Sequence, residues 1–397
     1  MRAKERLLSA AEPLSGKMLA YRSLRGSASS DHLDMVRGLA ALAVMLGHLR
    51  FLFFVDLSEV ANSNPIVKLL YFLSGFGHFA VMAFFVLSGF LVGGSVLRGR
   101  MDGDFSWSLY ATNRLTRLWI VLIPALLIGA ILDHMGIRLF GTMGIYGVLP
   151  GRSDGGLFPI APRLSGSIML GNILFLQGIS TVTFGSNGPL WSLSYEFWYY
   201  VLFPLIVLAY PAEKIGRSTV LYLGAAFAVI FFIGETISLY FLIWLLGAAL
   251  NLAPERSGSP GKLWVLMVIG AVVVAVAVLK FKPADNEYSD FFVGVASAAF
   301  IFAMLRIRSR SKSGLYSRTA RRLAGFSYTL YLVHVPALQF VSAWLVPGRR
   351  WQPDAAHVAI VAGLGLCTLA YAFVIARFTE DQTGPVRSRA IAALGLG

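Results

Sequence analysis

The sequence predicts an all-α, polytopic membrane protein with about ten transmembrane helices. Of its 397 residues, 57% are hydrophobic and only 14% are charged, which is too apolar for a soluble globular protein. The apolar residues also come in long runs, as membrane-spanning helices require. The net charge of +14 resides in short basic segments between these runs, as in cytoplasmic loops. We therefore expect a multi-pass protein of the cell inner (plasma) membrane, with the lipid bilayer as a partner and no nucleic acid.

The positions of charge between the runs predict the topology. Residues 1–38 hold seven Lys or Arg against four Asp or Glu, and residues 306–322 hold seven basic residues and no acidic one. Both segments lie in the cytoplasm if the chain crosses ten times with both termini inside. The ten runs lie near 39–56, 79–97, 117–134, 190–210, 218–234, 236–250, 262–280, 290–306, 323–346 and 357–378.

A further apolar segment, 166–178, is expected to be re-entrant or interfacial. If it spanned the membrane, the basic segment 306–322 would lie outside, against the positive-inside rule. Non-helical backbone at membrane depth is tolerated only inside protein or along a cavity.

The chain divides into a cytoplasmic leader (1–33), one transmembrane domain (34–378) and a cytoplasmic tail (379–397). The single cysteine, Cys367, excludes an intrachain disulfide and a cysteine-based metal site, and we expect no metal.

The first span carries ionisable residues where lipid-facing sequence should have none. Arg37 and His48 are eleven residues apart, so on a helix they differ by only about 20° around the axis. Asp34 lies three residues before Arg37 and joins the same face, close enough to pair with it. Such residues usually face a protein interior or a water-filled cavity. The alternative is that Arg37 is an interfacial anchor and His48 a packing residue.

Two further sites have a functional and a structural interpretation. Arg114 and Arg117 project from neighbouring positions at the cytoplasmic mouth, where they either grip phosphates or anchor the helix. Ser88 lies in mid-span before Gly89 and Gly93, whose spacing is typical of close helix packing. A mid-span serine often bonds only to its own helix.

Residues 186–200 (SNGPLWSLSYEFWYY) predict a helix that opens at Pro189 and has one polar, aromatic face. That face carries Ser192, Glu196 and Tyr199. We expect Glu196 to approach His48 from the outer side and to fix its tautomer, unless it is a structural glutamate paired with an arginine. Trp191 belongs either to an interfacial belt or to the wall of a sugar-sized pocket.

Residues 325–336 (GFSYTLYLVHVP) place Ser327, Tyr331 and His334 on one face of the ninth span. Pro336 cannot donate to the carbonyl of Leu332, so we expect a kink and an open carbonyl beside His334. His334 either binds the acceptor, carries a second proton, or is hydrogen-bonded to a neighbour.

Taken together, these motifs resemble the membrane-bound acyltransferase family 3. The resemblance rests on Arg37 and His48 with ten residues between them, FFVLSGF at 84–90, Arg114 with Arg117, WSLSYEFWYY at 191–200 and YTLYLVH at 328–334. It implies a ten-span O-acyltransferase that moves an acyl group, usually acetyl, from coenzyme A to a hydroxyl of a saccharide, a glycolipid or a related acceptor. Family members modify exopolysaccharides, lipopolysaccharide O-antigens, peptidoglycan and some macrolides.

The predicted site follows from what this transfer needs. His48 is the expected base, Glu196 orients it, and Arg37, Arg114 and Arg117 bind acyl-CoA, the donor substrate. No serine or cysteine is convincingly paired with a base, which favours direct transfer. The expected acceptor-side residues are Asp34, Ser88, Trp191, Ser192, Tyr199, Tyr331 and His334.

Two alternatives to a saccharide O-acetyltransferase stay open. The same ionisable residues would suit a proton-coupled transporter of an anionic solute, although the sequence lacks the internal repeats typical of such folds. The same chemistry would also serve a macrolide or a lipid acceptor. The oligomeric state is left open by the sequence.

Overall fold

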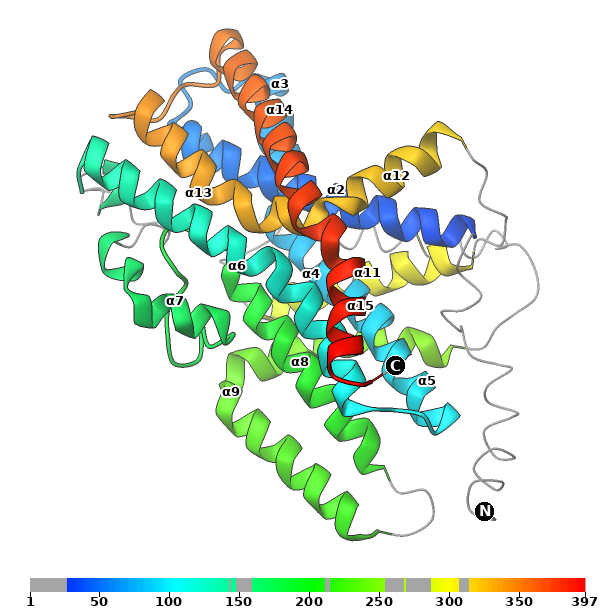
Figure 1. Cartoon of the computed structure of the whole chain (residues 1–397). Helices are drawn as coiled ribbons and strands as arrows, with labels where there is room; N and C mark the ends of the chain where they lie inside the picture. Colours follow the sequence, from blue (N-terminus) through cyan, green and yellow to red (C-terminus); the bar gives the residue numbers. More distant parts are fainter. Residues whose placement is uncertain are drawn as a thin grey trace. The chain divides into compact units, whose positions relative to one another are not determined.

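The predicted all-α architecture is confirmed over the part of the chain that the structure, a computed structural model, describes (Figure 1). That part comprises residues 27–142, 144–147, 159–210, 215–253, 268, 287–306 and 314–396. Within it, strand-like pairing is limited to isolated bridges. Among the described residues, six helical runs are long and apolar enough to cross a membrane: Ala28–Phe53, Pro65–Asp102, Trp107–Phe140, Leu190–Ala209, Arg217–Leu252 and Ala355–Ala393.

The expected number of ten spans is not confirmed, and the differences have identifiable causes. The expected spans 218–234 and 236–250 form one helical run, α9 (Arg217–Ala249), which kinks at Gly234, where φ is 76°. Only glycine adopts that conformation without strain. The expected span 262–280 falls almost entirely outside the described residues. The expected spans 290–306 and 323–346 coincide with shorter or more polar helices, α11 (Glu287–Leu305) and α13 (Ser327–Leu345).

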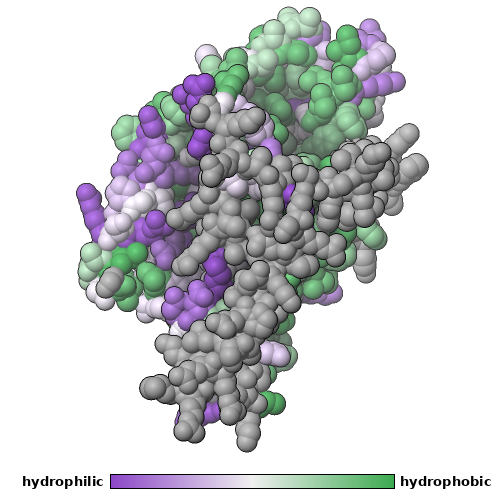
Figure 2. Space-filling view, turned by 90° about the vertical axis from the view of Figure 1, so that its right-hand side faces the viewer, coloured by the Kyte–Doolittle hydropathy of each residue, from purple (hydrophilic) through white to green (hydrophobic). Residues whose placement is uncertain are grey.

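The surface of several helices is apolar, as a lipid-facing surface must be. On the first arm of α9, Phe227 is 72% exposed and Phe231 is 84% exposed. On α3 (Pro65–Ser74), Ile66 is 78% exposed. In Figure 2, many described residues near the top are green, at the end where α3 and the start of α14 (Ala355–Phe378) lie in Figure 1. Exposed apolar area of this extent marks contact with lipid or protein. Together with the six long apolar helices among the described residues, it indicates a membrane protein.

The chain forms two compact units, which we describe separately. Unit 1 contains residues 1–37, 81–111 and 195–323, and unit 2 contains residues 38–80, 112–194 and 324–397. Several helices pass from one unit to the other, among them α2 (Ala28–Phe53), α4 (Gly77–Ser88) and α8 (Leu190–Ala209).

Unit 1 is built around a close contact between helices. After α4, the chain continues through the π-helical turn η3 (Gly89–Gly93) into α5 (Gly94–Asp102). A Cβ at Gly89 would lie 2.0 Å from the carbonyl oxygen of Trp244 on α9, and one at Gly247 would lie 1.9 Å from that of Val86. The backbones touch because glycine has no side chain, so the predicted packing role of Gly89 is confirmed. Unit 1 also contains α11 and most of α12 (Leu315–Gly325).

Unit 2 contains residues 38–53 of α2 and residues 190–194 of α8 together with several further elements. These are η2 (Leu57–Glu59), α3, most of α6 (Trp107–Phe140), η4 (Gly144–Tyr146), η5 (Ala161–Leu164), α7 (Gly166–Ile173), α13, α14, η7 (Glu380–Gln382) and α15 (Thr383–Ala393). Helix α7 lies in the segment that was expected not to span. Its 8 residues extend only about 12 Å, too short to cross a bilayer.

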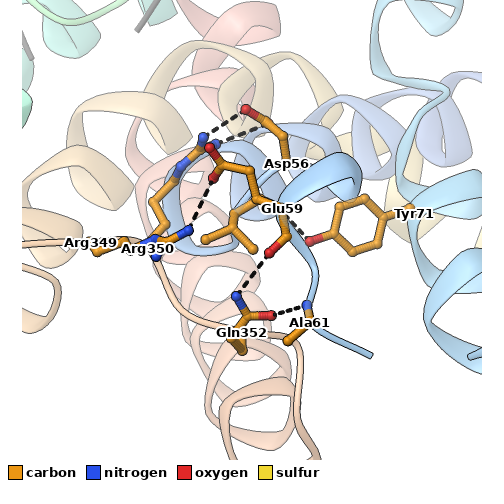
Figure 3. A network of polar contacts seen from close by, with 8 residues as sticks. Asp56, Glu59, Ala61, Tyr71, Arg349, Arg350 and Gln352 are labelled. Atoms are coloured by element: carbon orange, nitrogen blue, oxygen red, sulfur yellow. Dashed lines mark hydrogen bonds and ion pairs between the residues drawn. The ribbon is translucent and has the colours of Figure 1, made fainter. Parts of the chain in front are cut away.

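Contacts between two loops of unit 2, which we call the loop clamp, join α2 to α13. Arg350 donates to Asp56 Oδ2 at 2.8 Å and to Asp56 Oδ1 at 3.2 Å (Figure 3). It also donates to the carbonyl of Phe51 at 3.2 Å. Beside it, Gln352 donates to the carbonyl of Glu59 and accepts from the N–H of Ala61. Forked arginine pairs of this kind fix geometry, so the loop clamp sets how the ends of α2 and α13 meet.

Candidate active site

The centre of the candidate site is a pair of histidines from the two helices that the loop clamp joins. Nε2 of His334, on α13, lies 3.0 Å from Nδ1 of His48, on α2. The ring centroids are 5.0 Å apart. His334 is fully buried, whereas His48 is partly exposed. The two residues are 286 positions apart in the sequence, and unit 2 brings them together.

The hydrogen bonds of the histidine pair determine which nitrogens carry protons. Nδ1 of His334 lies 2.8 Å from the carbonyl of Leu330, and Nδ1 of His48 lies 3.0 Å from the carbonyl of Val44. A carbonyl only accepts, so both Nδ1 atoms are protonated. In the neutral pair, Nε2 of His334 therefore accepts from Nδ1–H of His48. Nε2 of His48 keeps its lone pair, and no described residue forms a hydrogen bond with it.

A polar cluster continues from the histidine pair within unit 2. The Tyr331 hydroxyl lies 2.7 Å from Ser192 Oγ and 3.3 Å from the carbonyl of Pro189. The ring centroid of Tyr331 is 6.3 Å from that of His334. Three residues predicted on the acceptor side, Ser192, Tyr331 and His334, thus lie in one cluster.

Asn187 completes this cluster, although the sequence showed it only as part of a turn. It is 3% exposed, and its Nδ2 donates to the carbonyl of Leu332 at 2.7 Å. That carbonyl is the one that Pro336 leaves open, so the predicted open carbonyl is present and Asn187 occupies it. The Oδ1 atom of Asn187 is buried and has no hydrogen-bond partner among the described residues.

Trp191 lies in unit 2 beside a histidine to which the sequence gave no role. The ring centroids of Trp191 and His78 are 6.3 Å apart, with an interplanar angle of 28°. Trp191 is partly exposed. The indole ring of Trp191 therefore stacks partly on the imidazole ring of His78.

Glu196 is placed in unit 1, in a second polar network. It accepts a hydrogen bond from Tyr200, whose hydroxyl lies 3.1 Å from Ser88 Oγ. Nε1 of Trp244 also donates to Ser88, at 3.2 Å. Ser88 therefore bonds to other helices rather than to its own. The expected bond between Glu196 in unit 1 and His48 in unit 2 stays a prediction.

Tyr199 lies in the interior of unit 1. It is 0% exposed, and its hydroxyl donates to the carbonyl of Ile237 at 2.7 Å. This contact ties α8 to the second arm of α9. It fills the hydrogen-bonding need of a buried tyrosine.

The predicted donor-side arginines lie in both units. In unit 1, Arg37 pairs with Asp34 at 3.3 Å, as their spacing predicted. In unit 2, Arg114 and Arg117 lie one turn apart on α6, and both are partly exposed. Among the described residues there is no group of three or more His, Cys, Asp or Glu able to hold a metal ion.

Comparison with known families decides the class of protein. A family model for an acyltransferase domain, that of acyltransferase family 3, matches residues 31–377. The chain belongs to acyltransferase family 3. The comparison with curated proteins gave no match, and the comparison with solved structures gave none.

This result agrees with the resemblance seen in the motifs, and it defines the coarse activity. As a member of acyltransferase family 3, the chain is a membrane acyltransferase. The matched residues include both histidines of the pair, the arginines and the whole of α8.

Proposed function

We propose that this protein transfers an acyl group, in the first place acetyl, from acyl-CoA to a hydroxyl of a cell-surface or secreted saccharide, with His48 as the general base. The observation that carries the proposal is the histidine pair. His48 presents an unprotonated Nε2 with no described partner, while Nδ1 is held by His334 and by a carbonyl. A base needs this arrangement, because its lone pair must be aimed and its other nitrogen fixed.

The proposed reaction is a direct transfer. The acceptor hydroxyl oxygen attacks the thioester carbonyl carbon, and its proton moves to Nε2 of His48. The tetrahedral intermediate then collapses, the carbon–sulfur bond breaks, and the coenzyme A thiolate takes the proton back from His48. The products are the O-acyl ester and free coenzyme A, and the base is regenerated.

His334 supports this step as a hydrogen-bond acceptor for His48. When Nε2 of His48 takes a proton, the ring becomes a cation whose Nδ1–H still donates to Nε2 of His334 and to the carbonyl of Val44. Hydrogen bonds to the charged form stabilise it. The positive charge therefore forms where acceptors are already in place.

The remaining predicted residues keep their proposed roles. Arg37, Arg114 and Arg117 bind the phosphates of the donor, and forked guanidinium groups suit that task. The polar cluster of Ser192 and Tyr331 lies next to the histidine pair, which supports its assignment to the acceptor. Asp34, Ser88, Trp191 and Tyr199 are proposed on the acceptor side, and Glu196 as an orienting acid for His48.

The experiment is a comparison of acyl esters on the secreted polysaccharide of cells with and without this protein. We expect base-labile acetyl esters on the polysaccharide only in cells that contain the protein. In isolated membranes supplied with labelled acetyl-CoA, we expect the label to appear in these esters. The matched variant His48→Ala should abolish labelling at an unchanged amount of inserted protein. If the label appeared on a macrolide or a lipid instead, the proposed acyl transfer would stand and the proposed saccharide acceptor would be wrong. Uptake of a labelled anionic solute into vesicles without any acyl donor would contradict the proposal.

A further inference from the structure

Helix α12 carries a basic surface that the proposed reaction does not use. Of its residues, Ser317, Ala320 and Ala324 are buried and form one face. The exposed face carries no acid and three arginines, Arg318, Arg321 and Arg322. Leu315, at the start of the helix, is 76% exposed. An exposed helix face with this composition is built for a negatively charged, partly apolar surface.

Helix α12 is fixed to the first turns of α2 within unit 1, beside which it lies in Figure 1. Ser317 donates to Asp31 at 2.6 Å, and the Tyr316 hydroxyl lies 2.7 Å from Nδ1 of His32. These contacts hold the buried face, so the exposed face has a fixed direction relative to α2.

The charges on the exposed face are only partly neutralised. Arg321 lies 3.9 Å from Asp31, which compensates one of the three arginines. Neither Arg318 nor Arg322 has an ion pair with a described carboxylate. These two are four residues apart, so they project from neighbouring positions on the helix.

We propose that α12 is a binding surface for anionic phospholipid headgroups, with Arg318 and Arg322 as the residues that contact the phosphates. Two uncompensated guanidinium groups at this spacing are complementary to a phosphodiester. On the predicted topology most of α12 lies in a cytoplasmic segment, residues 306–322, which has seven basic residues and no acid. Basic segments of this kind next to spans attract anionic lipids. The proposal is independent of the acyl-transfer reaction.

The test uses the purified full chain in nanodiscs of phosphatidylcholine with or without phosphatidylglycerol, followed by native mass spectrometry of the lipids that stay bound. We expect phosphatidylglycerol to be retained preferentially, and the double variant Arg318→Gln/Arg322→Gln to reduce that preference about tenfold. The matched control is Arg387→Gln/Arg389→Gln on α15, where both arginines are also exposed. It should keep the preference.

Three results would overturn the proposal. The first is no preference for phosphatidylglycerol in the unmodified protein. The second is an equal loss in both double variants, which would show a general effect of charge. The third is displacement of the bound lipid by free coenzyme A, together with a raised KM for the acyl donor in the α12 variant, which would assign the arginines to the donor.

Discussion

At the scale of single residues, the site depends on how buried polar atoms find partners. Pro336 removes the N–H that would serve the carbonyl of Leu332, and Asn187 supplies a donor from another element. The same logic pairs His48 with His334, since each ring nitrogen that faces the interior meets an acceptor or a donor. Leaving such a group unpaired is costly.

The pairing of Asn187 with Leu332 predicts a coupled effect of two substitutions. Asn187→Ala leaves a buried carbonyl without a donor and should lower stability by about 1–3 kcal/mol. Adding Pro336→Ala restores a helical N–H for that carbonyl, so the double variant should lose less than the sum of the single losses. Thermal unfolding in mild detergent measures this, and strictly additive shifts would show that the bond contributes nothing.

The histidine pair predicts that His334 acts by accepting a hydrogen bond. His334→Gln keeps an acceptor oxygen for Nδ1–H of His48, whereas His334→Leu removes it. We expect the leucine variant to lose roughly tenfold to a hundredfold in kcat and the glutamine variant to lose less, with little change in KM for the donor. Equal losses in two equally stable variants would reduce His334 to a packing residue.

Several of these residue contacts could be predicted from the sequence, but the partner of His48 could not. The shared helix face of Arg37 and His48, the pairing of Asp34 with Arg37 and the open carbonyl of Leu332 were predicted because each follows from local helix geometry. The bond between His48 and His334 joins residues 286 positions apart. A single sequence gives the face and the depth of a side chain, but not which other helix lies against it.

At the scale of elements, glycines decide where helices touch. Gly89 and Gly247 let the end of α4 and the π-helical turn η3 approach the second arm of α9 until the backbones meet. The sequence showed the spacing of Gly89 and Gly93, which is why the packing role was predictable. The partner helix and the kink at Gly234 were not, since a positive φ at one glycine cannot be read from hydropathy.

This contact predicts that alanine substitutions at two glycines of α9 have very different effects on stability. Gly247→Ala places a Cβ 1.9 Å from the carbonyl of Val86 and should cost about 1–3 kcal/mol of stability or more, because backbone must move. Gly224→Ala is the matched control, since nothing lies within 4 Å of its Cβ position, and alanine should be neutral or stabilise the helix by about 0.5–1 kcal/mol. Similar thermal shifts in both would contradict the packing.

At the scale of the whole molecule, the fold class was predictable and the number of spans was not confirmed. Composition and long apolar runs are global signals, so they predicted helices in a membrane. Counting spans needs helix ends, and buried polar residues interrupt the hydropathy of a helix, as in α13. The predicted topology, with both termini in the cytoplasm, stays a prediction.

Topology can be tested with single cysteines, because Cys367 is the only native one. In a Cys367→Ala background, Ser58→Cys lies in the exposed turn η2 and Ser388→Cys on the exposed helix α15. We expect a membrane-impermeant maleimide to label position 58 in intact cells and position 388 only after lysis. The reverse pattern, or labelling of both in intact cells, would contradict the predicted orientation.

The most direct test of the proposed function measures acetyl transfer in membrane vesicles that hold His48→Ala, His48→Gln or the unmodified protein at equal amounts. Labelled acetyl-CoA is supplied, and ester formation on the native saccharide is followed. Removing a general base should cost about a hundredfold to ten-thousandfold in rate while donor binding is retained. Transfer at the unmodified rate in either variant would show that the lone pair on Nε2 of His48 does not take the proton.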